Sequence, residues 1–418
     1  MRSFWNFAGA GHLAFGSGSA RHIGRLMTSR GLGRPFVVTD GNLARAGVVG
    51  AITEALRDSA LPFGVFEGGQ PEPTIDTALA ATAAADAFKP DCILGLGGGS
   101  NMDLAKIVAT LLAHGGKPAD YFGFNRIPGP ILPLVCVPTT SGTGSEVSHC
   151  AVLTDSAAQM KVSTLSPHMR PALAVVDPLL TLSCPAKATA DSGIDALTHA
   201  IEAATAVDFA SLEVPDGEPT PYDGRTPMGD LLAERAIRLV GRHLEAAVRE
   251  PSNLAAREGM SLAATLAGLA FSNCAVAAVH ALEYPLGGAL HVSHGAGNGL
   301  LLPYVMRFNL PARVPAFASI GRWLGVVPDG LSEPEAAEAA IRDLRATAKA
   351  LRALTEKIDE QGGGALDCFH DLHVGGLAVE DDQTGLAGIR QVDVAAVEAE
   401  IVDEALLGGR RLQRVEPS

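Results

Sequence analysis

Short apolar runs alternate with helix-forming segments through the first 140 residues, and this alternation is the strongest constraint on the fold. The apolar runs are strand-sized and bounded by Gly, Pro or Asp, while the segments between them are longer and rich in alanine. Parallel strands need crossover connections of this kind, so the pattern predicts a mostly parallel sheet with helices on both faces. Two shorter strands are predicted ahead of the series, at 4–7 and 13–15. The predicted strands of the series are 34–40, 62–66, 91–96 and 131–137, and the predicted helices are 48–57, 74–88 and 102–112.

The composition changes near residue 182, where Val- and Ile-rich runs give way to Ala, Leu and Glu at helical spacing. A chain of 418 residues is too long for one simple core, so two domains are expected. We predict an α/β domain over 1–182 and an all-helical domain over 183–418. The helices predicted in the second domain are 187–206, 228–247, 253–272, 274–289, 297–308, 312–324 and 333–358.

Charge and cysteine usage exclude several classes of protein. The formal net charge of −14, with no cluster of Lys or Arg, argues against a nucleic-acid surface. The six cysteines contain no C-x-x-C pair and favour buried thiols in a reducing compartment, which predicts a cytoplasmic protein. The first residues show no apolar leader, and the apolar run at 261–282 carries Ser272, Asn273 and His280, so a buried helix is expected rather than a membrane span.

A glycine-rich turn follows the predicted strand at 91–96 and opens the next helix. Gly97, Gly98 and Gly99 leave no Cβ between the backbone and a ligand, and Ser100 can cap the helix. The first N–H groups of a helix favour an anion such as a phosphate. The spacing is not the G-x-G-x-x-G fingerprint, and a tight strand–helix turn explains the glycines equally well. The turn alone therefore leaves a nucleotide site and a structural turn both open.

Asp40 ends the predicted strand at 34–40 and is the candidate for cofactor choice. A carboxylate in this place can accept hydrogen bonds from a ribose 2′-hydroxyl and repel a 2′-phosphate, which favours NAD over NADP. The same carboxylate can instead cap the helix that follows.

A hydroxyl-rich loop follows the predicted strand at 131–137 and reads P-T-T-S-G-T-G-S-E over 138–146. Its glycines allow the backbone to approach a ligand closely, and its hydroxyls can donate to phosphate or ribose oxygens. Without further context a run of this kind predicts only a turn. The candidate ligand-binding hydroxyls are those of Thr139, Thr140, Ser141, Thr143 and Ser145.

Two histidine-bearing blocks stand in the second half. Asp195 and His199 are four residues apart, so on a helix both side chains lie on one face and can reach one ion. His280 ends a long apolar run, and His291 and His294 follow it. One carboxylate with several imidazoles suits a divalent transition metal, but structural ion pairs have similar spacing. Spacing does not decide which of the three later histidines would bind.

Taken together, these blocks resemble the iron-containing (group III) alcohol dehydrogenases. The G-I-D-A-L-T-H run at 193–199 resembles the first ligand helix of that family, and the G-L-A-F-S-N run at 268–273 with the histidines after it resembles the second ligand block. The resemblance covers about residues 10–310 and is weak beyond them. The metal ligands that it implies are Asp195, His199, His280 and His294.

The two loops share this resemblance. The run at 97–106, which includes Asp103, resembles the family's pyrophosphate motif, and the run at 138–146 resembles its second cofactor loop. Lys161 matches a cofactor-facing lysine. The implied fold is an α/β dinucleotide-binding domain followed by an all-helical metal-binding domain, as in proteins related to dehydroquinate synthase.

The implied activity is hydride transfer between NAD and a small alcohol, giving an aldehyde or ketone. Fe²⁺ is the metal that the family implies, and Zn²⁺ also suits these donors. The resemblance further implies a homodimer with a small-molecule substrate and no nucleic-acid or membrane partner. Residues expected near the substrate are His149, Cys150 and Phe271. Tyr284 stands where many alcohol-active members have a proton-relaying histidine, and it is expected either to replace that group or to pack.

Two other activities remain open. A long Pro- and Gly-rich loop at 211–227, together with Tyr284, resembles the hydroxyacid–oxoacid transhydrogenase branch, in which Arg225 is a candidate partner for a substrate carboxylate. A non-redox enzyme or binding protein on the same scaffold is the third possibility. A second metal cluster at 367–373 is considered, but a solvated loop is the preferred interpretation there.

Overall fold

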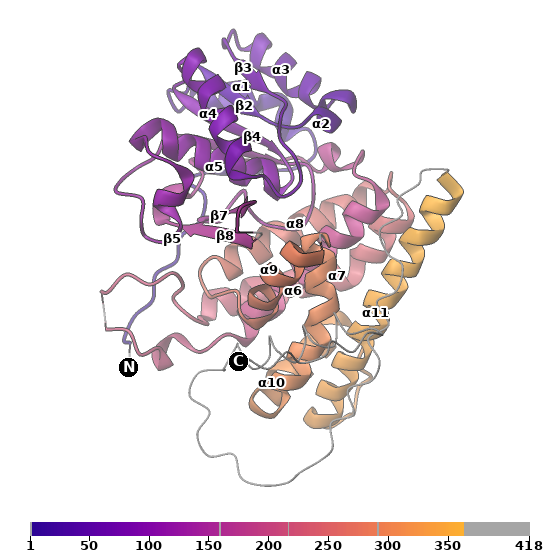
Figure 1. Cartoon of the computed structure of the whole chain (residues 1–418). Coiled ribbons are helices and arrows are strands. Elements are labelled where there is room, and N and C mark those ends of the chain that lie inside the picture. The colour runs from indigo at the N-terminus through magenta and orange to yellow at the C-terminus, as the bar shows by residue number, and fades with distance from the viewer. Residues whose placement is uncertain (1, 159, 216, 291, 363–418) are drawn as a thin grey trace, which may run out of the picture. The chain divides into compact units, whose positions relative to one another are not determined.

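The first half of the chain builds a six-stranded sheet, drawn from indigo to magenta in Figure 1. In the computed structural model, which describes residues 2–158, 160–215, 217–290 and 292–362, the strand order is β1-β9-β6-β4-β2-β3. Every neighbouring pair in this sheet runs parallel, as predicted. Its strands are β1 Leu13–Phe15, β2 Pro35–Val38, β3 Gly64–Phe66, β4 Cys92–Gly97, β6 Leu134–Pro138 and β9 Leu173–Val176.

Helices cover both faces of this sheet because side chains along each strand alternate between the faces. Phe36 and Val38 of β2 pack in one core cluster with residues of α4 and α5. Val37, between them, packs in the opposite cluster with residues of α1 and α3. The helices of this half are α1 Ile23–Thr28, α2 Gly41–Arg45, α3 Val48–Asp58, α4 Ile75–Phe88 and α5 Gly99–His114.

The strand order creates a topological switch point at the carboxyl ends of β2 and β4. The chain moves from β2 outward to β3, and then returns past β2 to form β4, so its direction across the sheet reverses there. Open α/β sheets bind ligands at such a switch point. Asp40 and the glycine turn Gly97–Gly99 lie at these two strand ends, as the sequence predicted.

Two features of this half differ from the predictions. The predicted strand at 4–7 is wrong: the segment forms no strand, and its backbone instead binds the helical half, with the Asn6 N–H donating to Asp223 and the Ala8 N–H donating to Asn273. A second sheet, in the order β5-β8-β7, was not predicted. It consists of β5 Gly123–Phe124, β7 Cys150–Asp155 and β8 Met160–Leu165, of which β7 and β8 are antiparallel.

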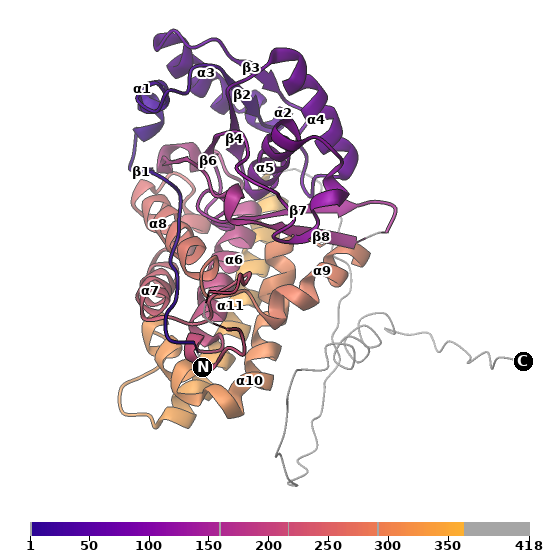
Figure 2. The ribbon, with the colours of Figure 1, turned by 90° about the vertical axis from the view of Figure 1, so that its left-hand side faces the viewer.

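The second half of the described chain is helical, as predicted, and Figure 2 shows it from the side. Two of its helices begin at side-chain caps: the Thr226 hydroxyl accepts from the Gly229 N–H at the start of α7, and Asn253 accepts from the Ala256 N–H at the start of α8. The non-helical backbone of Arg313 divides α10 at a kink. These helices are α6 Ala186–Thr205, α7 Pro227–Arg249, α8 Leu254–Phe271, α9 Ala278–Leu290, α10 His294–Leu324 and α11 Glu333–Gly362.

The two halves belong to one compact unit, which ends at Ile358. The domain boundary predicted near 182 lies between β9 and α6, and it stays a prediction. Among the described residues, no helix combines the length and apolar content needed to cross a membrane. The considered cluster at 367–373 and a last helix expected at 392–406 lie outside the described residues.

Candidate metal and cofactor site

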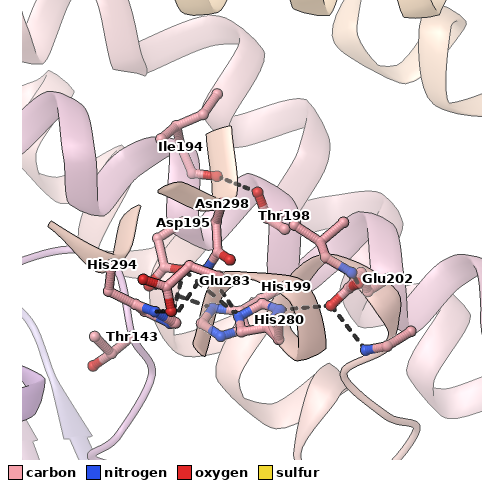
Figure 3. A network of polar contacts seen from close by, with 12 residues as sticks. Thr143, Ile194, Asp195, Thr198, His199, Glu202, His280, Glu283, His294 and Asn298 are labelled. Atoms are coloured by element: carbon pink, nitrogen blue, oxygen red, sulfur yellow. Dashed lines mark hydrogen bonds and ion pairs between the residues drawn. The ribbon is translucent and has the colours of Figure 1, made fainter. Parts of the chain in front are cut away.

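Three of the four predicted metal ligands meet at one point between three helices. Asp195 on α6, His280 on α9 and His294 at the start of α10 each offer a donor atom, and these atoms lie within 4.8 Å of one another. Figure 3 shows the three side chains pointing toward one another. Asp195 and His280 are buried and His294 is partly buried. The sequence separations of these residues are large, so it is the packing of the helices that brings them together.

His199 lies beside this group. Its ring stacks on His280 at a centroid distance of 4.5 Å and on Phe271 at 4.2 Å. Its Nδ1 is buried, has no hydrogen-bond partner among the described residues and lies 3.8 Å from Asp195 Oδ2. The i, i+4 spacing on α6 does put His199 next to Asp195, as predicted. Its role as the fourth ligand stays a prediction, because its donor is not part of the converging set.

A buried carboxylate accepts from the far nitrogen of each converging imidazole. Glu202 binds His280 Nδ1 at 2.6 Å and also accepts from the backbone N–H groups of Ala277 and Val279. Glu283 binds His294 Nδ1 at 2.5 Å. With Nδ1 donating to a carboxylate, Nε2 of each ring is left facing Asp195, which is the arrangement that metal-binding histidines adopt.

The donor set fits a divalent transition metal. The side-chain nitrogen of Asn298 lies 2.8 Å from Asp195 Oδ1 and 3.2 Å from Nε2 of both His280 and His294, so three ligand-type atoms surround one point. A carboxylate with imidazoles is a donor set that suits iron or zinc. The buried Nδ1 of His199, which has no hydrogen-bond partner among the described residues, is a further nitrogen 3.8 Å from Asp195.

The electrostatics of the site also favour a cation. Burial alone would lower the pKa of His280, but the Glu202 and Asp195 carboxylates raise it to about 10. Burial would raise the pKa of Asp195, but the neighbouring imidazoles of His199, His294 and His280 hold it well below its usual value. Burial lowers the pKa of His199 to about 3. These shifts favour an ionised Asp195 and a protonated His280, and a bound metal would displace the His280 proton.

A cavity of about 140 Å³ joins the metal group to the predicted cofactor turn. All four predicted ligands line it, together with Tyr284. From the predicted cofactor set, the lining includes Gly99, Ser100, Asp103, Thr143, Ser145 and Lys161. From the predicted substrate set, it includes Cys150 and Phe271.

The glycine turn leaves space that any other residue would fill. Gly97 has φ +144°, which side chains rarely adopt, and a Cβ there would meet Asn101 at 2.2 Å. A Cβ on Gly99 would lie 2.6 Å from Thr143, a residue of the hydroxyl-rich loop. Gly99 is also the first residue of α5, and the N–H groups of a helix's first turn lack partners within the helix and favour an anion. The turn therefore fits the pyrophosphate of a dinucleotide.

Residues of the hydroxyl-rich loop serve partly to hold the two loops together. The Ser145 hydroxyl donates to Asp103 at 2.6 Å, and the buried Lys106 ammonium donates to Ser145 at 2.6 Å. Ser141 contacts Ser261 of α8 through a hydroxyl–hydroxyl bond of 3.1 Å. These bonds fix the loop from inside. Five predicted cofactor residues of these two loops do not line the cavity: Gly97, Gly98, Thr139, Thr140 and Ser141.

Asp40 caps α2, which was the alternative left open for it. One carboxylate oxygen accepts from the N–H groups of Asn42 and Leu43, and the other accepts from Asn101 at 2.7 Å. Asn101 in turn donates to the Leu96 carbonyl of β4, so Asp40 is tied to the glycine turn. Asp40 does not line the cavity, and its contact with a ribose stays a prediction.

Tyr222 and Tyr284 close the end of the cavity next to Cys150. Tyr222 comes from the long loop before α7, and burial raises the pKa of both hydroxyls well above the ordinary value, with Cys150 adding to it. His149 lies behind this end: its Nε2 contacts the Pro221 carbonyl at 3.0 Å, and it does not line the cavity. Its predicted contact with substrate therefore has no direct geometric support, and the side chain holds the long loop instead.

Several residues at the site were not predicted. Glu283 is fully buried and binds both Lys161 and His294, yet the sequence shows it only as one charge in an apolar run, three residues after His280. Residues three apart on a helix lie close together, so the spacing from His280 could have marked Glu283 as a neighbour of the metal group. Glu72 pairs with Lys161 at 2.7 Å from a loop with no motif. His291 lies outside the described residues.

Comparison with known families matches nearly the whole described chain. Residues 10–178 match the family described as "Iron-containing alcohol dehydrogenase", and residues 222–362 match "Fe-containing alcohol dehydrogenase family, C-terminal". The first segment spans the sheet-bearing half from β1 to β9, and the second spans α7 to α11 of the helical half, while α6 lies between the two.

Individual relatives agree with this assignment. The chain is 36% identical over 329 residues to an NAD-dependent methanol dehydrogenase of Bacillus methanolicus, covering 78% of this chain and 81% of that protein. It is 41% identical over 312 residues to long-chain-alcohol dehydrogenase 1 of Geobacillus thermodenitrificans, covering 74% of each. Among solved structures, a 1,3-propanediol oxidoreductase superposes with a TM-score of 0.76 at 34% identity, covering 84% of this chain and 87% of the other.

Proposed function

The chain belongs to the iron-containing alcohol dehydrogenase family and is an NAD-dependent oxidoreductase; from this premise we propose that it interconverts short, uncharged alcohols and their aldehydes. One observation carries the proposal. The converging donors of Asp195, His280 and His294 line the same cavity as Gly99 of the cofactor turn. An ion and a dinucleotide that shared this cavity would both reach one small substrate.

We assign the ion to Asp195, His199, His280 and His294. When bound, Fe²⁺ supplies Lewis acidity at the substrate oxygen and NAD⁺ supplies the hydride chemistry. The chain's own contribution is orientation. Glu202 and Glu283 hold the two imidazoles with Nε2 toward Asp195, and the buried ring of Phe271 covers His199 and keeps water from that side.

Tyr284 is proposed to orient the substrate by donating a hydrogen bond. Because burial raises the pKa of its hydroxyl well above the ordinary value, the group keeps its proton at neutral pH. It cannot act there as a base, but it can direct a substrate oxygen. A role of this kind differs from the proton-relaying histidine that many relatives have at this position.

An uncharged substrate follows from the charges around the cavity. Lys161 is the one Lys or Arg among the described lining residues, and it already binds Glu72 at 2.7 Å and Glu283 at 2.9 Å. Arg225, which the sequence offered for a substrate carboxylate, binds both oxygens of Asp230 and does not line the cavity. A hydroxyacid would therefore lack a free cationic partner, and no observation favours the transhydrogenase activity.

We also propose a cytoplasmic homodimer with a domain boundary near residue 182. The five cysteines in the described part of the chain are all free thiols, in keeping with a reducing compartment. Light scattering on the purified full-length protein tests the dimer. A mass that corresponds to one chain at micromolar concentration would contradict it.

The activity is tested anaerobically with the Fe²⁺-loaded protein, NAD⁺, and a panel of short alcohols, diols and hydroxyacids. We expect NADH absorbance to rise with uncharged alcohols and to stay flat with hydroxyacids. A matched reaction includes an added 2-oxoacid. The proposal would give way to the transhydrogenase activity if two results were seen together. Alcohols would release no free NADH, and oxoacid reduction would equal hydroxyacid oxidation.

A further inference from the structure

Glu283 is a fully buried carboxylate whose two oxygens bind two different parts of the site. Oε1 accepts from the Lys161 ammonium of β8 at 2.9 Å, and Oε2 accepts from His294 Nδ1 of α10 at 2.5 Å. The Glu283 side chain itself comes from α9, so it joins three elements. Figure 3 shows it next to His294 in this network of polar contacts.

Two glycines make the space that this carboxylate occupies. A Cβ on Gly287 would lie 2.4 Å from Glu283 Oε1 and 2.6 Å from Lys161 Nζ. A Cβ on Gly297 would lie 2.8 Å from Glu283 Cγ. Any side chain at either position would displace the carboxylate or its ammonium partner. The surroundings are thus shaped for this bridge, which a buried charge needs if it is to stay ionised.

Glu202 gives the matched contrast within the same site. It orients the other imidazole, His280, but its remaining bonds come from the backbone of Ala277 and Val279 at the start of α9. Glu202, which orients His280, is therefore itself held by backbone N–H groups. Glu283, which orients His294, is instead held by the side chain of Lys161, a residue that lines the cavity.

We propose that Glu283 is a positioning residue that fixes the His294 imidazole and the Lys161 ammonium together, and so links metal binding to cofactor binding. The inference rests on the proposed function in one respect, which is that Lys161 faces the cofactor. An ion held by His294 fixes Glu283, and Glu283 then fixes Lys161 where NAD binds. By linkage, a bound cofactor strengthens metal binding by the same factor.

The test measures the coupling between two ligands and does not depend on turnover. Full-length protein is stripped of metal, and NADH dissociation constants are measured by fluorescence with and without Zn²⁺. We expect Zn²⁺ to strengthen NADH binding by about fivefold or more in the unaltered protein. In E283Q, which keeps the size of the side chain and removes its charge, we expect this ratio to fall to nearly one. Zn²⁺ affinity, measured against a coloured chelator, should also fall by about tenfold or more.

E202Q is the matched control, because it weakens the other imidazole's partner without touching Lys161. It should lower Zn²⁺ affinity by a similar factor. The ratio of NADH dissociation constants measured without and with Zn²⁺ should stay unchanged. If E283Q fails to fold by circular dichroism, K161M provides the second test: the ratio should again fall to nearly one, while Zn²⁺ affinity stays within about threefold.

The proposal is overturned if the unaltered protein shows no coupling, if E283Q keeps the full ratio, or if E202Q abolishes it equally. These outcomes are distinct from failure of the proposed activity. The unaltered protein could oxidise no alcohol and still show Zn²⁺–NADH coupling that E283Q loses. That result would support the link through Glu283 and reject the proposed alcohol substrate. If the unaltered protein oxidises alcohols but E283Q keeps the Zn²⁺–NADH coupling, the proposed activity is supported and the link through Glu283 is rejected.

Discussion

The metal group and the cofactor turn line one cavity, but they are built in different ways. The metal group consists of side chains from α6, α9 and α10, and each imidazole is oriented by a further buried carboxylate. The cofactor turn consists largely of backbone at a strand end, and its key residues matter because they lack a Cβ. A charge change should therefore disable the first region, and an added methyl group should disable the second.

The largest expected effect concerns the metal group. Asp195→Ala removes the only carboxylate of the converging group, so we expect metal retention to be lost and turnover to fall by on the order of a thousandfold or more. NADH affinity of the metal-free variant should equal that of the metal-free parent. Metal content by mass spectrometry and NADH fluorescence measure the two quantities. A loss of NADH affinity in the metal-free variant would show that the regions are not separable.

The converse change is Gly99→Val. The new side chain would meet Thr143 within 2.6 Å, so the turn must open and the α5 N-terminus must move from the phosphate position. We expect NADH affinity to fall by about tenfold to a hundredfold. Metal content should remain at the parent level. Unchanged NADH binding in a folded variant would remove the glycine turn from the cofactor site.

The two regions should also differ in their response to pH. Against the effect of burial, Glu202 and Asp195 raise the pKa of His280 to about 10 in the metal-free site, so at neutral pH a metal must displace a proton there. Binding releases that proton, and metal affinity should therefore rise by about tenfold per pH unit between pH 6.5 and 8.5. NADH affinity of the metal-free protein should be nearly flat over this range. A metal affinity without pH dependence would contradict a protonated site.

The smallest expected effect concerns the substrate end. Tyr222 limits the cavity from the long loop, so Tyr222→Ala should raise kcat/KM for six-carbon over two-carbon alcohols by about tenfold relative to the parent. Metal and NADH affinities should not change. His149→Gln, which alters the loop contact without lining the cavity, is the control and should leave the chain-length preference unchanged. Equal preferences in Tyr222→Ala and the parent would place the length limit elsewhere.

The contrast between the regions also explains what the sequence could predict. The alternation of strands and helices fixes the parallel sheet and its glycine turn, because these depend on local patterns of apolar residues. The i, i+4 spacing of Asp195 and His199 is equally local. The choice of His280 and His294 came from family resemblance, since spacing left it open.

The remaining features depend on tertiary packing. Glu283 lies 122 residues from Lys161, and no periodic pattern connects a residue of β8 with one of α9. The segment at 4–7 has the aromatic composition of a strand, but it binds the helical half by single backbone bonds. Asp40 shows a third case, in which one carboxylate satisfies a local capping role and also ties β2 to Asn101.

The central claim is that substrate, metal and nicotinamide meet in one cavity, and isotope transfer tests it most directly. The Fe²⁺-loaded protein is given NAD⁺ and a short primary alcohol deuterated at the carbinol carbon. The deuterium content of the NADH formed is then measured by mass spectrometry. The account predicts one deuterium in every NADH, because hydride passes directly between the two molecules. NADH without deuterium, formed at the same rate as aldehyde, would contradict a shared cavity.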